Sequence, residues 1–150
     1  YEKALSYGED PYLYGNLGWG YYLLGDYILS VENSRKALAM NPKLNYVRMN
    51  MGIAYIKKGA YKSAYDSYES LLKYSPDHDE YEGGMRDLME LQQGYPGVYP
   101  FTNFALAHLY KQQGRNMEAS ELLHKFLRQN FSVSFWNHKA RSFLREMESE

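Results

Sequence analysis

A spacing of 34 residues recurs in the first half of this 150-residue sequence and constrains its fold more than any other feature. Residues of one type lie 34 positions apart at six places: Gly18 and Gly52, Tyr21 and Tyr55, Gly25 and Gly59, Tyr27 and Tyr61, Leu38 and Leu72, and Pro42 and Pro76. Chance rarely aligns glycine, proline and aromatic positions at one offset. Such a period is typical of proteins built from stacked repeats, so the sequence predicts a repeat array.

Helix start and stop signals predict two antiparallel helices in each period. Residues 11–24 begin with proline and end before Gly25-Asp26. Residues 27–40 end at Asn41-Pro42, because proline lacks an N–H and its ring clashes with a continuing helix. The second period repeats this pattern over residues 45–58 and 61–74, closed by Ser75-Pro76. Each period is therefore expected to form a helical hairpin.

The residues of these hairpins resemble the tetratricopeptide repeat (TPR), whose pattern asks for a bulky residue, Leu-Gly, Tyr, Gly, Tyr, a small residue, Ala and Pro. The first period supplies Tyr14, Leu17, Gly18, Tyr21, Gly25, Tyr27, Ser30, Ala37 and Pro42. The second supplies Met51, Gly52, Tyr55, Gly59, Tyr61, Ala64 and Pro76. It departs from the pattern with Arg48 at the bulky position and Leu71 in place of Ala. The resemblance implies an all-α fold, a right-handed superhelical α-solenoid of stacked helix-turn-helix units.

On this resemblance the chain divides into six segments. They are the tail of a preceding repeat at 1–7, repeats at 11–44 and 45–78, an irregular acidic helix and loop at 79–99, a third TPR-like repeat at 100–131 and a capping helix at 134–148. The third repeat matches at Leu106, Tyr110 and Gly114, but has Asn116 at the second turn tyrosine and Phe131 at the closing proline. Because Lys3-Ala4-Leu5 parallels Lys36-Ala37-Leu38, we expect the chain to be part of a longer array.

The small residues of the repeats are expected to let paired helices approach closely, with Gly52 facing Ala64 and Gly18 facing Ser30. A larger side chain at Gly52 is expected to overpack this contact, at a cost of about 1 to 3 kcal/mol. The turn glycines Gly25, Gly59 and Gly114 are expected to take the left-handed conformation that ends a helix.

Residues 76–99 concentrate acidic side chains, with Arg86 as the single basic residue. The acids are Asp77, Asp79, Glu80, Glu82, Asp87 and Glu90. One interpretation is a solvated helix whose first turn favours negative charge. The other is a docking patch for a basic partner, and the sequence leaves both open.

The C-terminal segment carries apolar residues at the spacing of an amphipathic helix, namely Trp136, Ala140, Phe143, Leu144 and Met147. We expect this helix to cap the last repeat. It could instead continue into a further repeat or mediate self-association.

In the tetratricopeptide family the first helix of each pair lines a concave groove, so the resemblance implies a set of partner-binding residues. These are Tyr12, Asn16, Trp19, Tyr22, Tyr46, Asn50, Ile53, Lys57, Phe101, Phe104, His108 and Lys111. Trp19 and Tyr22 are the expected anchors, because aromatic side chains dominate interface hot spots. The alternative for Trp19 is packing against an upstream repeat. An amide at Asn16 or Asn50 can pair with both the donor and the acceptor of an extended backbone.

The expected partner is a protein or peptide with an apolar or aromatic binding segment. Chaperone-binding members of the family read a terminal carboxylate with a basic clamp. The corresponding positions here hold Gly15, Trp19, Phe101 and Ala105, and only Asn50 matches. Recognition of a terminal carboxylate is therefore not expected. The resemblance implies instead a non-catalytic scaffold with an aromatic groove. The alternative is a structural or regulatory segment of a larger enzyme or multiprotein assembly.

Other function classes find little support in the sequence. There is no cysteine, and His78, His108, His124 and His138 lack the spacing that would place two imidazoles on one metal. No nucleotide-binding glycine loop or Gly-x-Ser-x-Gly elbow appears, so we expect no catalysis, no cofactor and no metal. A net charge of -1 with scattered basic residues disfavours nucleic acid. No apolar run predicts a membrane span or signal peptide, and the compartment stays open between cytoplasm and bacterial periplasm.

Overall fold

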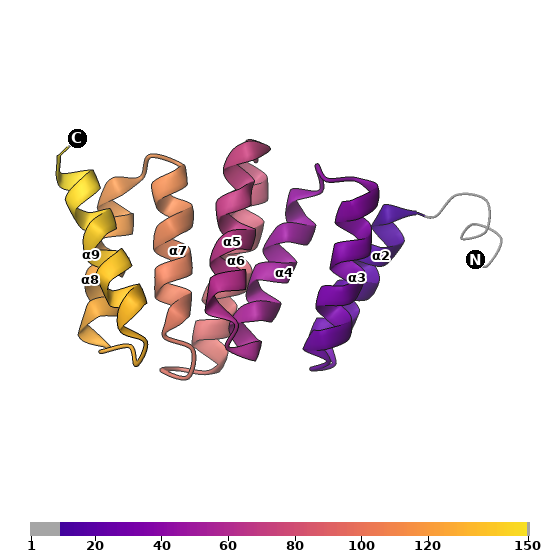
Figure 1. The fold of residues 1–150 in the computed structure, drawn as a ribbon, viewed down its shortest axis with the longest axis horizontal. Helices are drawn as coiled ribbons and strands as arrows, with labels where there is room; N and C mark the ends of the chain where they lie inside the picture. Colours follow the sequence, from indigo (N-terminus) through magenta and orange to yellow (C-terminus); the bar gives the residue numbers. More distant parts are fainter. Residues whose placement is uncertain (1–9, 150) are drawn as a thin grey trace. The chain divides into compact units, whose positions relative to one another are not determined.

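The computed structural model describes residues 10–149, so the repeat tail predicted at 1–7 lies outside the described residues. The described residues contain helices, short connections and no β-strand (Figure 1). They divide into two compact units between residues 80 and 81. The predicted all-α, helical-repeat class is confirmed.

The first unit consists of two helical hairpins and the start of a further helix. Its elements are α2 (Pro11–Leu23), α3 (Tyr27–Met40), α4 (Asn45–Lys58), α5 (Tyr61–Glu69) and the 3-10 helix η1 (Ser70–Lys73). Consecutive helices pack together, and α4 contacts both α2 and α3. The helix predicted at 61–74 therefore ends earlier as an α-helix and tightens into η1.

Local chemistry explains where these helices begin and end. The Asp10 side chain accepts a hydrogen bond from the backbone N–H of Tyr12 at 2.9 Å, and that of Asp26 accepts one from Leu29 at 3.1 Å. These N-caps satisfy amide donors that have no partner within the helix. The turn glycines Gly25, Gly59 and Gly114 have φ angles of 83°, 79° and 75°, so the predicted left-handed conformation is confirmed.

Close helix packing explains two of the repeated glycines. A Cβ atom at Gly52 would lie 2.5 Å from the ring of Tyr68, and one at Gly18 would lie 2.6 Å from Ser34 Oγ. Close approach is confirmed, but the nearest neighbour of Gly52 is the Tyr68 ring and not the predicted Ala64. The prediction missed it because a tyrosine one turn further along α5 can reach over the smaller residue.

Arg48 replaces the bulky residue expected in the second repeat. Its guanidinium lies 4.1 Å from the centre of the Tyr74 ring, and Nη1 donates a hydrogen bond to the carbonyl oxygen of Pro42. Burial lowers the pKa of Arg48, and the neighbouring Tyr74 opposes that shift. A stacked cation thus occupies this position and ties α4 to the segments on either side.

The second unit contains most of α6 (His78–Gly94), followed by α7 (Phe101–Gln112), α8 (Asn116–Arg128) and α9 (Ser134–Glu148). α7 packs on α8, and α8 packs on α9. A continuous aromatic cluster fills the interior, formed by Phe101, Phe104, Phe126, Phe131, Trp136 and Phe143. Burial of these rings supplies the main stabilisation of the unit.

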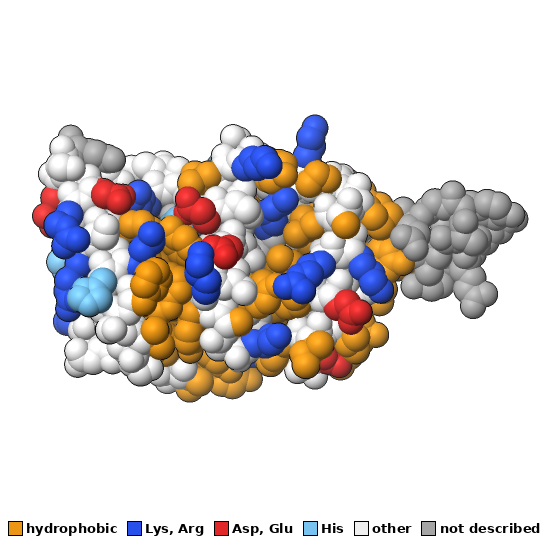
Figure 2. Space-filling view, viewed as in Figure 1, with side chains coloured by type: hydrophobic (Ala, Val, Ile, Leu, Met, Phe, Trp, Pro, Cys, Tyr) orange, Lys and Arg blue, Asp and Glu red, His pale blue; other side chains and the backbone are white. Residues whose placement is uncertain are grey.

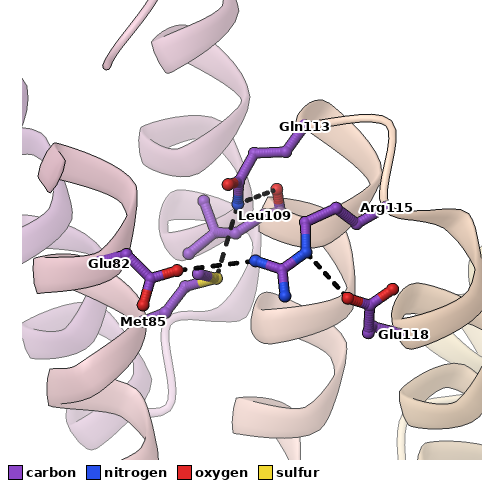
Figure 3. Close-up of polar contacts among 6 residues, drawn as sticks. All are labelled: Glu82, Met85, Leu109, Gln113, Arg115 and Glu118. Atoms are coloured by element: carbon purple, nitrogen blue, oxygen red, sulfur yellow. Dashed lines mark hydrogen bonds and ion pairs between the residues drawn. The ribbon is translucent and has the colours of Figure 1, made fainter. Parts of the chain in front are cut away.

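Several acids of the segment 76–99 have structural contacts. Asp77 and Glu80 exchange backbone and side-chain hydrogen bonds in a reciprocal capping box at the start of α6. Glu82 lies 3.5 Å from Arg115, which also bonds Glu118 at 2.8 Å (Figure 3). These contacts accord with the solvated-helix interpretation. The docking patch for a basic partner stays a prediction.

Candidate partner-binding surface

The surface of α2 is unusual because the helix has no charged side chain and little of it is buried. Its buried residues are Gly15, Gly18 and Tyr22. The helix packs on α3 and α4. Apolar and aromatic side chains on its remaining surface are consequently exposed or half-buried.

Three aromatic rings form what we call the α2 aromatic cluster, Trp19, Tyr22 and Tyr27. The Trp19 and Tyr22 rings are stacked, with centroids 4.8 Å apart and planes 18° from parallel. Tyr27, at the start of α3, lies 5.8 Å from Tyr22. The ammonium group of Lys57 on α4 lies 5.4 Å from the Tyr22 ring and 5.7 Å from the Tyr27 ring. The cluster is thus held by three helices and carries a cation on its ring faces.

Two further predicted residues continue this surface along α2. Tyr12 is 54% exposed and Asn16 is exposed, and their spacing places them on the same helix face as Trp19. Tyr46 of α4 comes beside them, since a Cβ atom at Gly15 would lie 2.7 Å from the Tyr46 hydroxyl oxygen. Burial, with smaller contributions from Tyr12 and Asp10, raises the pKa of Tyr46. Tyr46 therefore stays neutral at pH 7, and the surface gains no charge from it.

The structure places five other predicted groove residues in the interior, whereas Lys57 and Lys111 are half-buried. Asn50, Ile53, Phe101, Phe104 and His108 are all buried. Phe104 is 1% exposed and lies 5.7 Å from Phe143 of α9, which also stacks on His108. For Phe101, Phe104 and His108 the physical reason is that α9 covers α7, which the repeat register alone did not indicate. Asn50 and Ile53 are buried on α4 within the first unit. Burial counts against partner contact at these five residues, and their role in binding stays a prediction.

The same packing bears on the predicted self-association through the C-terminal helix. Trp136 is 3% exposed and meets Phe101 and Phe104 edge-on at 5.0 and 5.4 Å. The apolar face of α9 is thus occupied within its own unit. Self-association stays a prediction, and Trp136 is not available to mediate it.

Sequence reasoning missed two features of this region. Tyr27 was interpreted as a turn residue, although its place four residues after the end of α2 brings its ring to Tyr22. A hollow of about 390 Å³ on α2 was also missed. It is lined by Leu13, Asn16, Leu17, Gly20, Tyr21 and Leu24. The missing side chain at Gly20, flanked by apolar residues one turn away on each side, is the signal that could have indicated it.

The described residues offer little for other kinds of site. Within residues 10–149 no group of three or more His, Asp and Glu side chains could hold a metal ion. None of the described helices combines the length and apolarity needed to cross a membrane. Figure 2 shows Lys and Arg side chains scattered among hydrophobic ones over α3 and α4, without a continuous basic stripe.

Stacked helical hairpins of this kind define the class of helical-repeat proteins. Residues 11–44 and 46–78 each match the family model of the tetratricopeptide repeat. These two segments are therefore tetratricopeptide repeats, as the sequence pattern predicted. Such repeats generally mediate protein–protein interactions and are generally non-catalytic modules. No curated protein sequence matches the chain.

Proposed function

We propose that the protein is a non-catalytic interaction module that binds an apolar or aromatic segment of a partner protein on the exposed face of α2. The observation that carries this proposal is the stacked Trp19–Tyr22 pair on a helix without charged side chains, continued by exposed Tyr12 and Asn16. Tyr46 lies at the edge of the same surface.

Preorganisation favours Trp19 as the anchor of this surface. Stacking on Tyr22 restricts the indole ring before a partner arrives, so less side-chain entropy is lost on binding. A half-buried tryptophan still offers a ring edge and part of a face to a partner. Large aromatic side chains of this kind account for most hot-spot energy in protein interfaces.

Polar groups at the edge of the surface would orient the partner. The Asn16 amide offers both a donor and an acceptor to a peptide backbone. Lys57, which lies over Tyr22 and Tyr27, places one cation beside an otherwise uncharged face. The partner segment is therefore expected to be apolar or aromatic with its polar groups near its ends.

The test is a selection of displayed peptides on the intact chain, followed by affinity measurement with variants. Trp19→Ala is expected to weaken binding of the selected peptides by about thirtyfold, the equivalent of about 2 kcal/mol. Tyr12→Ala is expected to weaken it less. Phe135→Ala is a matched control, because Phe135 and Tyr12 are each 54% exposed and Phe135 lies on α9. An equal loss in the control, or full binding by Trp19→Ala with unchanged helical circular dichroism, would refute the proposal.

A second function is favoured by the hollow on α2 and by the exposed Leu24 and Ile28 beside it. These residues suit a structural or regulatory segment whose apolar side packs against another part of a larger assembly. Leu24→Glu with Ile28→Glu is then expected to release the protein from its native complex in size-exclusion chromatography of extracts. Met117→Glu, at an exposed apolar residue of α8, is the control and is expected to leave that complex intact.

A further inference from the structure

A second candidate site lies in the other unit, away from the surface of the proposed function. It is a hollow of about 180 Å³ between the end of α6, the loop at 95–100, the start of α7 and the end of α8. We call it the amide pocket after three of the residues that line it, Gln92, Asn103 and Gln129. Figure 2 shows hydrophobic side chains gathered over the loop that joins α6 to α7. The pocket thus combines apolar and polar walls.

The polar wall is a series of three hydrogen-bonded side-chain amides, which we call the amide chain. Gln92 Nε2 donates to Asn103 Oδ1 at 2.6 Å, and Asn103 Nδ2 donates to Gln129 Oε1 at 2.8 Å. Asn103 is only 2% exposed, so the middle amide is buried, and its two part-buried hydrogen bonds hold Gln92 and Gln129 in place.

The two ends of the amide chain match the polar groups of a peptide bond. Gln129 retains its Nε2–H donors and Gln92 retains lone pairs on Oε1, and both residues line the pocket. Reversing all three amides would exchange the two ends but would still leave a donor at one and an acceptor at the other. A backbone lying across the pocket therefore meets complementary groups in either orientation.

The apolar wall consists of two tyrosine rings from the loop. Tyr95 and Tyr99 meet edge-on, with centroids 5.9 Å apart and planes at 84°. Tyr95 is exposed and Tyr99 is half-buried, and prolines follow both. Perpendicular rings form a notch with apolar walls, the kind of groove that holds proline rings of a polyproline II helix. Such a helix makes no internal hydrogen bonds, so its carbonyl groups are available to the amide chain.

The size and charge of the amide pocket limit the class of ligand further. A hollow of about 180 Å³ is below the range of about 300 to 1,000 Å³ that holds cofactors and other small molecules, so it suits one or two side chains of an extended chain. Lys125 is exposed and lines the pocket, where it would attract a carboxylate.

We propose that the amide pocket binds an extended, proline-containing peptide segment with an acidic residue next to its proline. The segment would place a proline ring in the corner that the perpendicular Tyr95 and Tyr99 rings form. A backbone carbonyl oxygen would accept a hydrogen bond from Gln129. The N–H of the acidic residue would donate one to Gln92, because proline has no N–H, and the carboxylate would face Lys125. This binding site is separate from the α2 surface and takes a different class of ligand.

The probe is a fluorescein-labelled oligoproline peptide with one glutamate beside the prolines, titrated with the intact chain and followed by fluorescence anisotropy. Saturable binding is expected. Tyr95→Ala removes an exposed ring and is expected to weaken binding about tenfold without loss of helical circular dichroism. Equal binding of a peptide in which alanine replaces every proline, no binding of the probe, or undiminished binding by Tyr95→Ala would overturn the proposal.

Exchanging the charges of Lys125 and of the acidic residue in the peptide tests the contact between them. Lys125→Glu is expected to weaken binding of the glutamate peptide and to strengthen binding of the same peptide with lysine in place of glutamate. Arg141→Glu is the matched control, since Arg141 is exposed on α9 and does not line the pocket. Equal changes in both variants would show a general charge effect and overturn the assigned contact. Trp19→Ala is expected to leave this binding unchanged, which separates the result from that on α2.

Discussion

The first helices of two hairpins, α2 and α7, differ sharply in what surrounds them. α2 buries three residues, whereas every residue of α7 from Phe101 to Leu109 is buried. Within the second unit α7 packs on α8, is bonded by side chains of α6 and is covered by Trp136 and Phe143 of α9. Side chains at equivalent repeat positions therefore differ in their exposure to solvent. The neighbouring helices determine whether such a side chain faces solvent or the core.

The two helices also differ in the residues at matching positions. When they are aligned on their turn glycines, Gly25 and Gly114, α2 has Gly15 where α7 has Phe104. In α2 the space above Gly15 is taken by the Tyr46 side chain, whereas Phe104 fills the aromatic cluster of its own unit. An aromatic surface and a core layer thus occur on one helical framework and differ by a few side chains.

The largest expected effect is the loss of a core ring from α7. Phe104→Ala leaves a cavity beside Phe126, Trp136 and Phe143 and is expected to lower the free energy of unfolding by about 3 to 5 kcal/mol. Tyr12→Ala, at an exposed aromatic residue of α2, is expected to change it by less than about 0.5 kcal/mol. Urea denaturation of the variants measures both. Similar losses of unfolding free energy in the two variants would contradict the difference between α7 and α2.

A smaller effect is expected within α2 itself. Gly18→Ala brings a Cβ atom within 2.6 Å of Ser34 Oγ and 3.0 Å of the Ser30 carbonyl oxygen, and is expected to cost about 1 to 3 kcal/mol. At Gly20 an added Cβ meets nothing within 4 Å, so Gly20→Ala is expected to stabilise the helix by about 0.5 to 1 kcal/mol. The melting temperatures of Gly18→Ala and Gly20→Ala, measured by thermal unfolding, test both expectations. A destabilised Gly20→Ala would show that the outer side of α2 is covered.

A pH-dependent effect is expected in the second unit. Burial, with the nearby Glu90, raises the pKa of Asp87 from 3.8 to about 6, and Arg86 partly offsets this shift. Because the folded state binds the proton more tightly, the contribution of Asp87 to stability falls as pH rises from 3.8 to about 6.

Asp87→Asn removes this ionisation. It is expected to raise the melting temperature at pH 7.5, with the gain disappearing as pH falls toward 3.8. Melting curves recorded over this range check the direction. A gain of the same size at all pH values would show that ionisation of Asp87 is not its cause.

The sequence predicted those features that depend on local chemistry. Asp26 and Gly25 mark a turn through capping and backbone conformation, and both act within a few residues of their own positions. The stacking of Trp19 on Tyr22 is likewise local, because residues three apart on a helix are neighbours, while their role as partner anchors stays a prediction.

Features that depend on distant segments could not be predicted in this way. The burial of Phe104 depends on Phe143, and the approach of Tyr68 to Gly52 depends on the fit of two helices. The amide pocket joins Gln92 to Gln129 through Asn103. The period of 34 residues determines repeat positions, but it carries no information about these pairings.

The claim that α2 presents aromatic side chains to a partner while α7 does not is tested most directly with the two tryptophans of the chain. Trp19 lies on α2 and is half-buried, whereas Trp136 packs on α7 and is 3% exposed. Acrylamide quenching of fluorescence is measured on Trp136→Phe, which reports Trp19, and on Trp19→Phe, which reports Trp136. We expect Trp19 to be quenched more steeply than Trp136. Equal quenching, or steeper quenching of Trp136, would contradict the account.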